Sequence, residues 1–313
     1  MPTGAATSIK GSPISQLIDQ VSTIIVGKRE QVTLSVICLL SGGHLLIEDV
    51  PGVGKTTLSQ ALARSLGLSF SRIQFTSDLL PSDLVGVSVY ERQKEVFVFH
   101  PGPVFAQVLL ADEINRAGPR TQSALLEAME ERQVSVEGET RALPSPFFVI
   151  ATQNPSEQLG THPLPESQLD RFAMRLSLGY PDPAAERALL IGEDRRTALH
   201  ALQSVIPPDD WAQWQSRVDQ IHVADSLLEY LQTLITATRD GRWFALGLSP
   251  RAGLSLLRLA RARALVLGRN HVSPEDIQVL WVPAVAHRLL ALPQSGRSAA
   301  AQARALLEAT RVP

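Results

Sequence analysis

The chain has 313 residues, enough for about two domains, and its composition, 44% hydrophobic and 19% charged, is that of an ordinary globular protein. Its formal net charge of -2 gives no basic footprint of the kind that nucleic-acid-binding proteins carry. A single cysteine, Cys38, leaves no intrachain disulfide and no cysteine-based zinc site, which favours a reducing compartment.

The N-terminal part of the chain combines a polar end with helical periodicity. Residues 1–12 are small and polar, and we expect them to be frayed. Neither a signal-peptide core nor a long uncharged apolar run is found, so we expect a cytoplasmic protein without a membrane span. Apolar residues recur at helical spacing over 14–40, where Cys38 is interpreted as a core residue.

This helical pattern is broken at Ile24-Ile25-Val26-Gly27-Lys28. An apolar turn there, just before a glycine-rich segment, is well placed to receive an adenine ring. Packing between two helices explains the same residues equally well. The sequence therefore leaves two interpretations of Val26 and Gly27 open.

The glycine-rich segment is a candidate phosphate-binding loop. An apolar strand over 44–47 leads into Asp49-Val50-Pro51-Gly52-Val53-Gly54-Lys55-Thr56-Thr57, and a helix begins near Leu58. Gly52 and Gly54 let successive backbone N–H groups curl round an anion, and the helix presents its positive end there. Lys55 is expected to reach the β- and γ-phosphates, and Thr56 to hold Mg²⁺ through its hydroxyl.

One residue departs from the usual pattern of such loops, G-x-x-x-x-G-K-[ST]. Asp49 stands where the first glycine is expected. Because this position leaves the strand rather than wrapping the phosphates, we expect its carboxylate to point away from them. The alternative for the whole segment is a glycine-rich turn with an incidental lysine.

The next segments predict a strand over 70–75, a short helix around 79–85 and a hairpin. In the hairpin, residues 86–90 and 95–99 alternate apolar with polar on either side of the charged tip Glu91-Arg92-Gln93-Lys94. A solvated hairpin without a function is the alternative to a functional insertion near 87–99.

A second chemical signal is the apolar run 108–111, which leads directly into Asp112 and Glu113. Carboxylates at the end of a buried strand need a cation or a proton transfer to compensate them. Asp112 fits a Mg²⁺ ligand, mostly through water, and Glu113 fits the group that polarises an attacking water. A strand end with two solvated acids is the alternative.

A helix over 121–132, a second hairpin over 134–143 with Gly138 in its turn, and an apolar strand over 147–151 follow. Strands that alternate with helices predict a parallel sheet, whose ligands gather at the carboxyl ends of the strands. Asn154 should therefore lie beside Asp112, Glu113 and the phosphate loop, where its amide could orient a water or a γ-phosphate. A turn asparagine before Pro155 is the alternative.

A last strand is predicted near 174–178, after which Pro181 and Pro183 mark a boundary and the chain becomes helical. We expect an α/β nucleotide-binding domain over 1–180 and a helical domain over 181–313. Ser249 and Ser273, each followed by proline, are predicted N-caps, and Ser273 also has capping-box spacing with Asp276.

Taken in order, these segments resemble the MoxR family of AAA+ ATPases over nearly the whole chain. The resemblance implies an α/β fold, namely a P-loop nucleotide-binding domain with a parallel sheet followed by a small all-helical lid domain. It also implies Mg²⁺-dependent ATP hydrolysis, a ring that is commonly a hexamer, and a chaperone-like role. The partner in that family is often a protein with a von Willebrand factor A domain carrying a metal-dependent adhesion site. The segments are Ile25-Val26-Gly27, Pro51 to Thr56, Asp112-Glu113-Ile114-Asn115-Arg116, Ala151-Thr152-Gln153-Asn154-Pro155, Leu169-Asp170-Arg171-Phe172 and Leu248-Ser249-Pro250-Arg251-Ala252.

The resemblance also implies roles for individual residues. Lys55 and Thr56 belong to the phosphate loop, Asp112 and Glu113 to the second acidic motif, and Asn154 is the first sensor. Arg171 resembles the arginine finger that acts on a neighbouring subunit, and Arg251 resembles the second sensor of the lid. An ion pair with Asp170 or another acid is the alternative for Arg171, and a surface position is the alternative for Arg251. The two hairpins match insertions that relatives use to engage clients or the ring pore.

Three other functions share most of these motifs. A magnesium-chelatase-like ATPase subunit also pairs with an adhesion-site partner, and the sequence separates it poorly from the MoxR family. A DNA-directed AAA+ motor would add a DNA-binding domain or a basic pore, and neither is evident. A nucleotide-binding scaffold without hydrolysis is disfavoured by Glu113.

Overall fold

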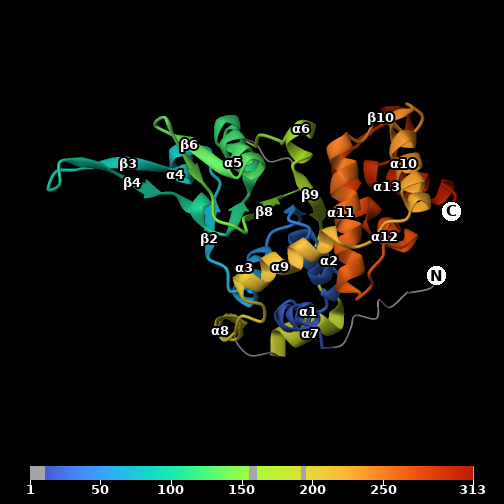
Figure 1. Ribbon diagram of the computed structural model, residues 1–313, viewed down its shortest axis with the longest axis horizontal. Helices are drawn as coiled ribbons and strands as arrows, with labels where there is room; N and C mark the ends of the chain where they lie inside the picture. The colour runs from blue at the N-terminus through green and yellow to red at the C-terminus, as the bar shows by residue number, and fades with distance from the viewer. Residues whose placement is uncertain (1–10, 155–160, 192–194, 313) are drawn as a thin grey trace.

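The computed structural model describes residues 11–154, 161–191 and 195–312 (Figure 1). Pro155, and residues 1–10 of the expected frayed end, lie outside these ranges. The first half of the chain contains α1 (Pro13–Ile24), α2 (Arg29–Leu40), β1 (His44–Glu48), α3 (Lys55–Ser65), β2 (Phe70–Gln74), α4 (Pro81–Val85), β3 (Gly86–Glu91), β4 (Val96–Pro101), η1 (Pro103–Phe105), β5 (Val108–Asp112), η2 (Ile114–Arg116), α5 (Pro119–Glu131), β6 (Gln133–Val136), β7 (Glu139–Ala142), β8 (Phe148–Gln153), α6 (Glu166–Leu169) and β9 (Phe172–Leu176). The second half is mainly helical and contains α7 (Pro183–Ile191), α8 (Arg195–His200), α9 (Pro208–Asp219), α10 (Asp225–Arg239), β10 (Phe244–Leu246), α11 (Pro250–Val266), α12 (Pro274–Val285), η3 (Ala286–Arg288), β11 (Leu290–Ala291), η4 (Pro293–Ser295) and α13 (Ala299–Ala309).

The centre of the fold is a five-stranded parallel sheet in the order β2-β5-β8-β1-β9. The middle residues of its inner strands are apolar because helices cover both faces, and every residue of β5 is buried. Since the strands are parallel, their carboxyl ends share one edge. The loops that follow β1, β5 and β8 therefore meet at that edge, as the sequence predicts.

Alternating residues of each strand point to opposite faces of this sheet. Leu45 and Ile47 of β1 join the buried cluster formed with α1, α2 and α3, while Leu46 joins the cluster formed with α5. The β1 strand thus lies in the middle layer of three, and the turn that follows it is held by cores on both sides.

Both predicted hairpins are present as separate two-stranded sheets. Strand β3 pairs with β4, with Glu91 opposite Val96 at the turn, and β6 pairs with β7 across a turn containing Gly138. In Figure 1 the β3–β4 hairpin extends far beyond the remainder of the molecule. Its outer part therefore lacks the packing partner that the alternating pattern would require for a half-buried strand.

The C-terminal helices carry the caps predicted from the sequence. The Ser249 side chain accepts a hydrogen bond from the backbone N–H of Ala252, and Ser273 and Asp276 form a capping box. Asp276 is fully buried, where Arg263 and Arg269 pair with its carboxylate. Among the described residues, no helix is long and apolar enough to cross a membrane.

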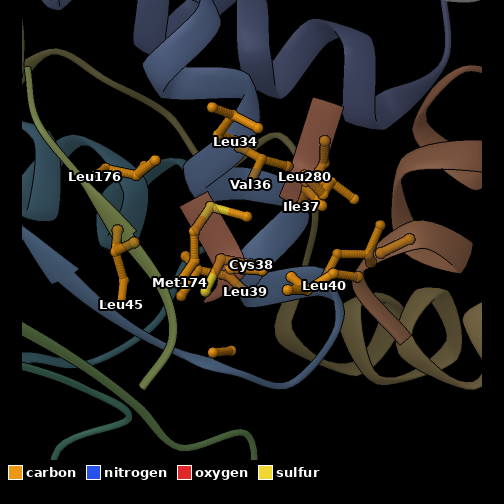
Figure 2. Close-up of a cluster of buried hydrophobic side chains, with 14 of the residues drawn as sticks. Leu34, Val36, Ile37, Cys38, Leu39, Leu40, Leu45, Met174, Leu176 and Leu280 are labelled. Atoms are coloured by element: carbon orange, nitrogen blue, oxygen red, sulfur yellow. The ribbon is translucent and has the colours of Figure 1, made fainter. Parts of the chain in front are cut away.

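Helix α2 joins the sheet to the C-terminal helices. Its residues 34 and 36–40 are buried, and Figure 2 shows them among Leu45 of β1, Met174 and Leu176 of β9, and Leu280 of α12. Cys38 is fully buried within this cluster, which confirms its interpretation as a core residue. A helix that is apolar on all sides needs such a position between two layers. The sheet and the C-terminal helices thus share one continuous core.

The last strand of the sheet lies two residues earlier than predicted, at Phe172–Leu176 rather than 174–178. The residues beyond Leu176 leave the sheet because a side chain captures them. Ser177 and the backbone N–H of Gly179 both donate to the carboxylate of Asp49. A local apolar pattern cannot indicate this contact, since its partner lies far away in the sequence.

Candidate active site

The turn between β1 and α3 forms an open cradle. Gly52 and Gly54 have positive φ values of 85° and 97°, which side chains other than glycine adopt rarely. Apart from the adjacent residues of the turn, the described part of the chain places no atom within 4 Å of where a Cβ would stand on either glycine, so the turn borders open space. Gly54 is the N-cap of α3, whose first N–H groups have no partner within the helix. The turn therefore offers backbone donors and a helix dipole to an anion.

Lys55 lies across this turn. Its Nζ donates to the backbone oxygens of Asp49 at 2.6 Å and Val50 at 3.2 Å, and to Oδ1 of Asn154 at 3.2 Å. Burial lowers the pKa of the Lys55 ammonium, while the nearby carboxylates of Asp49, Asp112 and Glu113 oppose that shift. An approaching phosphate would offer the ammonium a stronger, charged partner than these carbonyl oxygens.

Asn154 links the lysine to the acids. While its Oδ1 accepts from Lys55, its Nδ2 lies 3.4 Å from Oε1 of Glu113. Strand β8, which ends at Gln153, lies between β1 and β5 in the sheet, so Asn154 emerges between the phosphate loop and the acidic pair. The three predicted residues Lys55, Asn154 and Glu113 are thus brought together at one edge of the sheet.

Glu113 is held in a defined conformation. Its backbone has a positive φ of 56°, which is uncommon for a residue other than glycine, and its N–H donates to the hydroxyl of Thr152 at 2.9 Å. Arg116 donates to Oε2 of Glu113 at 2.8 Å. The carboxylate is therefore directed by Arg116 and Asn154 rather than free to rotate.

Asp112 is compensated by two residues whose roles sequence reasoning missed. Arg72 of β2 donates to Oδ2 of Asp112 at 2.7 Å, and the Thr152 hydroxyl donates to Oδ1 at 2.5 Å. Strand β2 mixes apolar and polar residues, Phe70-Ser71-Arg72-Ile73-Gln74, so nothing in its sequence distinguishes Arg72 from an ordinary solvent-facing residue. Thr152 is part of the segment 151–155 that resembles the MoxR family. Only the folded structure shows that its hydroxyl donates to the Asp112 carboxylate and accepts from the backbone N–H of Glu113.

The residues at this edge fit a magnesium ion bound together with phosphates. Thr56 is in the first turn of α3, and Asp112 ends β5 with its carboxylate nearly buried. A hydroxyl and a carboxylate are the oxygen donors that Mg²⁺ prefers, with phosphate and water completing its shell. Within the described ranges, no three side chains among His, Cys, Asp and Glu gather into a metal site of their own.

A cavity of about 450 Å³ adjoins the phosphate loop. Its lining includes Ile24, Ile25, Val26, residues 51–54 and Thr57, together with Tyr180, Leu189 and Leu190. Gly27 does not line it; a Cβ on Gly27 would come within 2.8 Å of the Ala185 side chain, so this glycine permits close packing against α7. The size and apolar lining of the cavity suit a purine base, in agreement with the first interpretation of Val26.

The carboxylate of Asp49 points away from the cradle, as expected. It accepts hydrogen bonds from the backbone N–H of Val50 at 2.8 Å and of Gly179 at 2.6 Å, and from Ser177 at 3.0 Å. Burial raises the pKa of Asp49, but these hydrogen bonds outweigh it and leave the pKa below its ordinary value. Asp49 thus ties the phosphate loop to the segment that follows β9.

Asp49→Gly should destabilise the protein, although it would restore the glycine that phosphate loops usually carry. We expect the free energy of unfolding to fall by about 2 to 3 kcal/mol, because two backbone donors lose a charged acceptor. Asp49 lacks the positive φ that would call for glycine. The difference in stability between the wild type and Asp49→Gly should be largest at neutral pH and shrink in acid. The pKa of Asp49 is lowered in the folded protein, so its stabilising effect is lost as pH falls through the folded-state pKa.

Urea unfolding of the wild type, Asp49→Gly and Asp49→Asn would measure this effect. Asp49→Asn keeps one acceptor oxygen and should lose less stability. Equal unfolding midpoints for Asp49→Gly and the wild type would show that the hydrogen bonds to the Asp49 carboxylate contribute nothing to stability.

Arg171 and Arg251 lie at the opposite edge of the sheet. Arg171 directly precedes β9, which runs parallel to β1, whereas the phosphate loop follows the far end of β1. A strand of this length separates its two ends by about 15 Å. Arg251, in the first turn of α11, joins Arg171 at this edge because both pair with Glu130 of α5. The structure therefore does not bring these two arginines to the Lys55 site of the same chain.

The alternative considered for Arg171, an intrachain ion pair, is present, but its partner is Glu130. Arg171 Nε lies 2.9 Å from Oε2 of Glu130. Asp170 instead accepts from Ser249 at 2.9 Å and lies 3.4 Å from Nε of Arg288. Around these pairs is a cavity of about 380 Å³. Its charged lining consists of Glu130, Asp170, Arg132, Arg171, Arg251, Arg258 and Arg288.

Comparisons with known proteins agree with this architecture. Residues 44–174 match the model of the ATPase family associated with various cellular activities (AAA), and residues 236–309 match that of the AAA lid domain. The chain is 41% identical to the chaperone MoxR1 of Mycobacterium tuberculosis over 92% of this chain and 79% of that protein. It is 45% identical to YeaC of Bacillus subtilis over 96% and 95% of the two chains. The crystal structure of a putative ATPase from Cytophaga hutchinsonii superposes with a TM-score of 0.87 at 36% identity, over 96% of this chain and 95% of that one.

A parallel sheet with a phosphate loop, an acidic pair and an asparagine at one edge, followed by lid helices, defines a protein of the AAA+ ATPase class. Within that class, the chain belongs to the MoxR family.

Proposed function

We propose that the protein hydrolyses ATP with Mg²⁺ in a ring of identical subunits and uses the energy to remodel or activate a partner protein. The observation that carries the proposal is the hydrogen-bonded series Lys55, Asn154 and Glu113 beside an open phosphate cradle. These are the groups that phosphoryl transfer to water requires: a cation for the phosphates, a sensor amide, and a base.

Each residue would have a distinct task. The N–H groups of residues 52–56 and the Lys55 ammonium hold the phosphates, while Val26 and its neighbours enclose the base. Bound Mg²⁺, held by Thr56 and by Asp112 through water, would neutralise charge that develops on the phosphate oxygens. Glu113 accepts a proton from the attacking water, and Asn154, released by Lys55, orients that water or the γ-phosphate.

The ring is part of the proposal because, among the described residues, the arginines nearest the acidic pair, Arg72 and Arg116, are already paired with Asp112 and Glu113. Arg171 and Arg251 lie at the other edge of the same chain, where they can reach only the nucleotide of a neighbour. A head-to-tail arrangement closes into a ring when each subunit offers its arginine edge to the next subunit's phosphate loop. We propose a hexamer, with 1–180 as the nucleotide-binding domain, 181–313 as the lid, and the cytoplasm as the compartment.

The test of this function is release of phosphate from ATP by the purified protein, with Mg²⁺ and with a chelator, over a range of protein concentrations. The specific rate should rise with protein concentration as rings form. Mass photometry in the presence of ATP should show a particle with the mass of the proposed hexamer. A specific rate that stays at background under all these conditions would refute the proposal.

We propose that the partner carries a von Willebrand factor A domain and contacts the β3–β4 hairpin. On this hairpin the rings of Tyr90 and Phe97 pack in a tilted arrangement at a centroid distance of 5.2 Å, and Phe97 is 72% exposed. The tip charges are partly satisfied, since Lys94 pairs with Glu91 at 2.7 Å. Exposed aromatic pairs are typical anchors of protein interfaces, so the aromatic pair is a stronger candidate contact than Arg92 and Lys94.

Phe97→Ser should weaken capture of this partner by at least about 10-fold, the size expected for an aromatic anchor. Glu113→Gln protein loaded with ATP would serve as the trap, with recovered von Willebrand factor A proteins quantified by mass spectrometry. Leu254→Ser is the matched control, because Leu254 of α11 is equally exposed at 72% but lies away from the hairpin. Equal recovery by both variants would count against the hairpin, and ring mass measured in parallel would exclude an assembly defect.

A further inference from the structure

One carboxylate at the arginine edge holds both candidate trans-acting cations. The two oxygens of Glu130 are divided between them: Arg171 donates to Oε2 at 2.9 Å, and Arg251 donates to Oε1. The three residues come from separate elements, since Glu130 is in α5, Arg171 precedes β9 and Arg251 begins α11. Two guanidinium groups therefore converge on a single anion, which is the geometry that a terminal phosphate would require.

The surroundings of Glu130 favour an anion. Five arginines and two acids line the cavity, and Asp219 pairs with one of these arginines, Arg258, from outside the lining, so the arginines still outnumber the acids. Burial lowers the pKa of His44 in the cavity wall to about 4 and leaves that ring neutral. Asp170 is already engaged by Ser249 and Arg288. A hydrogen bond from Arg251 holds the pKa of the Glu130 carboxyl below its ordinary value, so it remains charged. Its side chain is nevertheless 30% exposed and can leave the site.

We propose that Glu130 occupies, in the isolated protomer, the place that the terminal phosphate of a neighbouring subunit's nucleotide takes in the ring. This inference rests on the proposed function, because it assumes that Arg171 and Arg251 act in trans. The carboxylate keeps the two arginines converged and neutralised until a triphosphate displaces it. A carboxylate and a phosphate repel each other, so both cannot remain on the same pair of arginines.

Binding of inorganic tripolyphosphate measures the competition between Glu130 and a phosphate for the two arginines without any ATP hydrolysis. The background is Lys55→Ala, which removes the main cation of the chain's own phosphate loop. In that background Glu130→Gln should bind inorganic tripolyphosphate about 3- to 10-fold more tightly, because a neutral amide competes less well for two partly exposed arginines. Further replacement of Arg171 or Arg251 by alanine should remove the gain. Glu131→Gln, an exposed neighbour on α5 with the same change in charge, is the control.

A second measurement uses the protein with Lys55 intact. Glu130→Gln should reach its half-maximal specific ATPase rate at a lower protein concentration than the wild type, because its arginines are already available to a neighbour. Tripolyphosphate binding no tighter in Glu130→Gln than in Glu131→Gln would overturn the assignment. Tighter binding without any ATP hydrolysis would instead refute the proposed function and leave the competing role of Glu130 supported.

Discussion

Glu113→Gln protein should bind ATP as the wild type does and hydrolyse it about 10²- to 10⁴-fold more slowly, the usual contribution of a general base. The amide is isosteric and keeps one acceptor oxygen, so it can retain one of the two hydrogen bonds, from Arg116 or from Asn154, that orient the side chain. It cannot accept the proton of the attacking water. This loss corresponds to about 2.7 to 5.4 kcal/mol of activation free energy.

Two further variants make this result specific. Lys55→Ala should lose nucleotide binding itself, because the phosphates lose their nearest cation, whereas Glu308→Gln on the exposed last helix should change neither property. Nucleotide affinity by fluorescence titration and single-turnover hydrolysis would separate binding from chemistry. If Glu113→Gln hydrolysed ATP at the wild-type rate, another residue would have to be the general base.

Arg171→Ala should slow hydrolysis by on the order of 10³- to 10⁵-fold while leaving the affinity for ATP nearly unchanged. The structure gives the reason for this separation. The side chain lies at the edge of the sheet opposite to its own phosphate loop, so each ATP keeps all the contacts that the loop of its own chain provides. It would remove a cation that stabilises the charge developing on the neighbour's γ-phosphate in the transition state much more strongly than it stabilises bound ATP.

Mixing distinguishes this trans role from a structural one. In rings made from Arg171→Ala and Glu113→Gln subunits, some interfaces combine an intact base with an intact arginine, so part of the activity should return. Arg304→Ala, on the exposed face of α13, is the control for lost positive charge. Mixed rings confirmed by mass that show no recovery would contradict action in trans.

The sequence predicts the elements whose signals are local. The phosphate loop and both hairpins follow from glycine positions and alternating patterns, and the meeting of Lys55, Asp112, Glu113 and Asn154 follows from parallel strands sharing an edge. These predictions need only the order of the elements and their periodicity.

Residues that act through distant partners could not be found in this way. Arg72 reaches Asp112 from a neighbouring strand, and Glu130 reaches Arg251 across 121 positions of sequence. Asp49 was recognised only as a departure from a motif, since Ser177 and Gly179, which bind its carboxylate, are far along the chain. Each of these contacts depends on side-chain direction in the folded protein, which periodicity does not specify.

The burial of α2 between the sheet and the C-terminal helices, chiefly α11, has a consequence for how the molecule unfolds. Leu39, Leu40 and their neighbours on α2 lie in one core with apolar residues of both parts. Separating the lid from the sheet would therefore expose a large apolar surface on α2 to water. We therefore expect the two parts to form one cooperative unit in which amide protection of α2 and α11 is lost together. Chain shortening that removes α11 and α12 would expose the apolar surface of α2 and favour aggregation, rather than release an independent nucleotide-binding module.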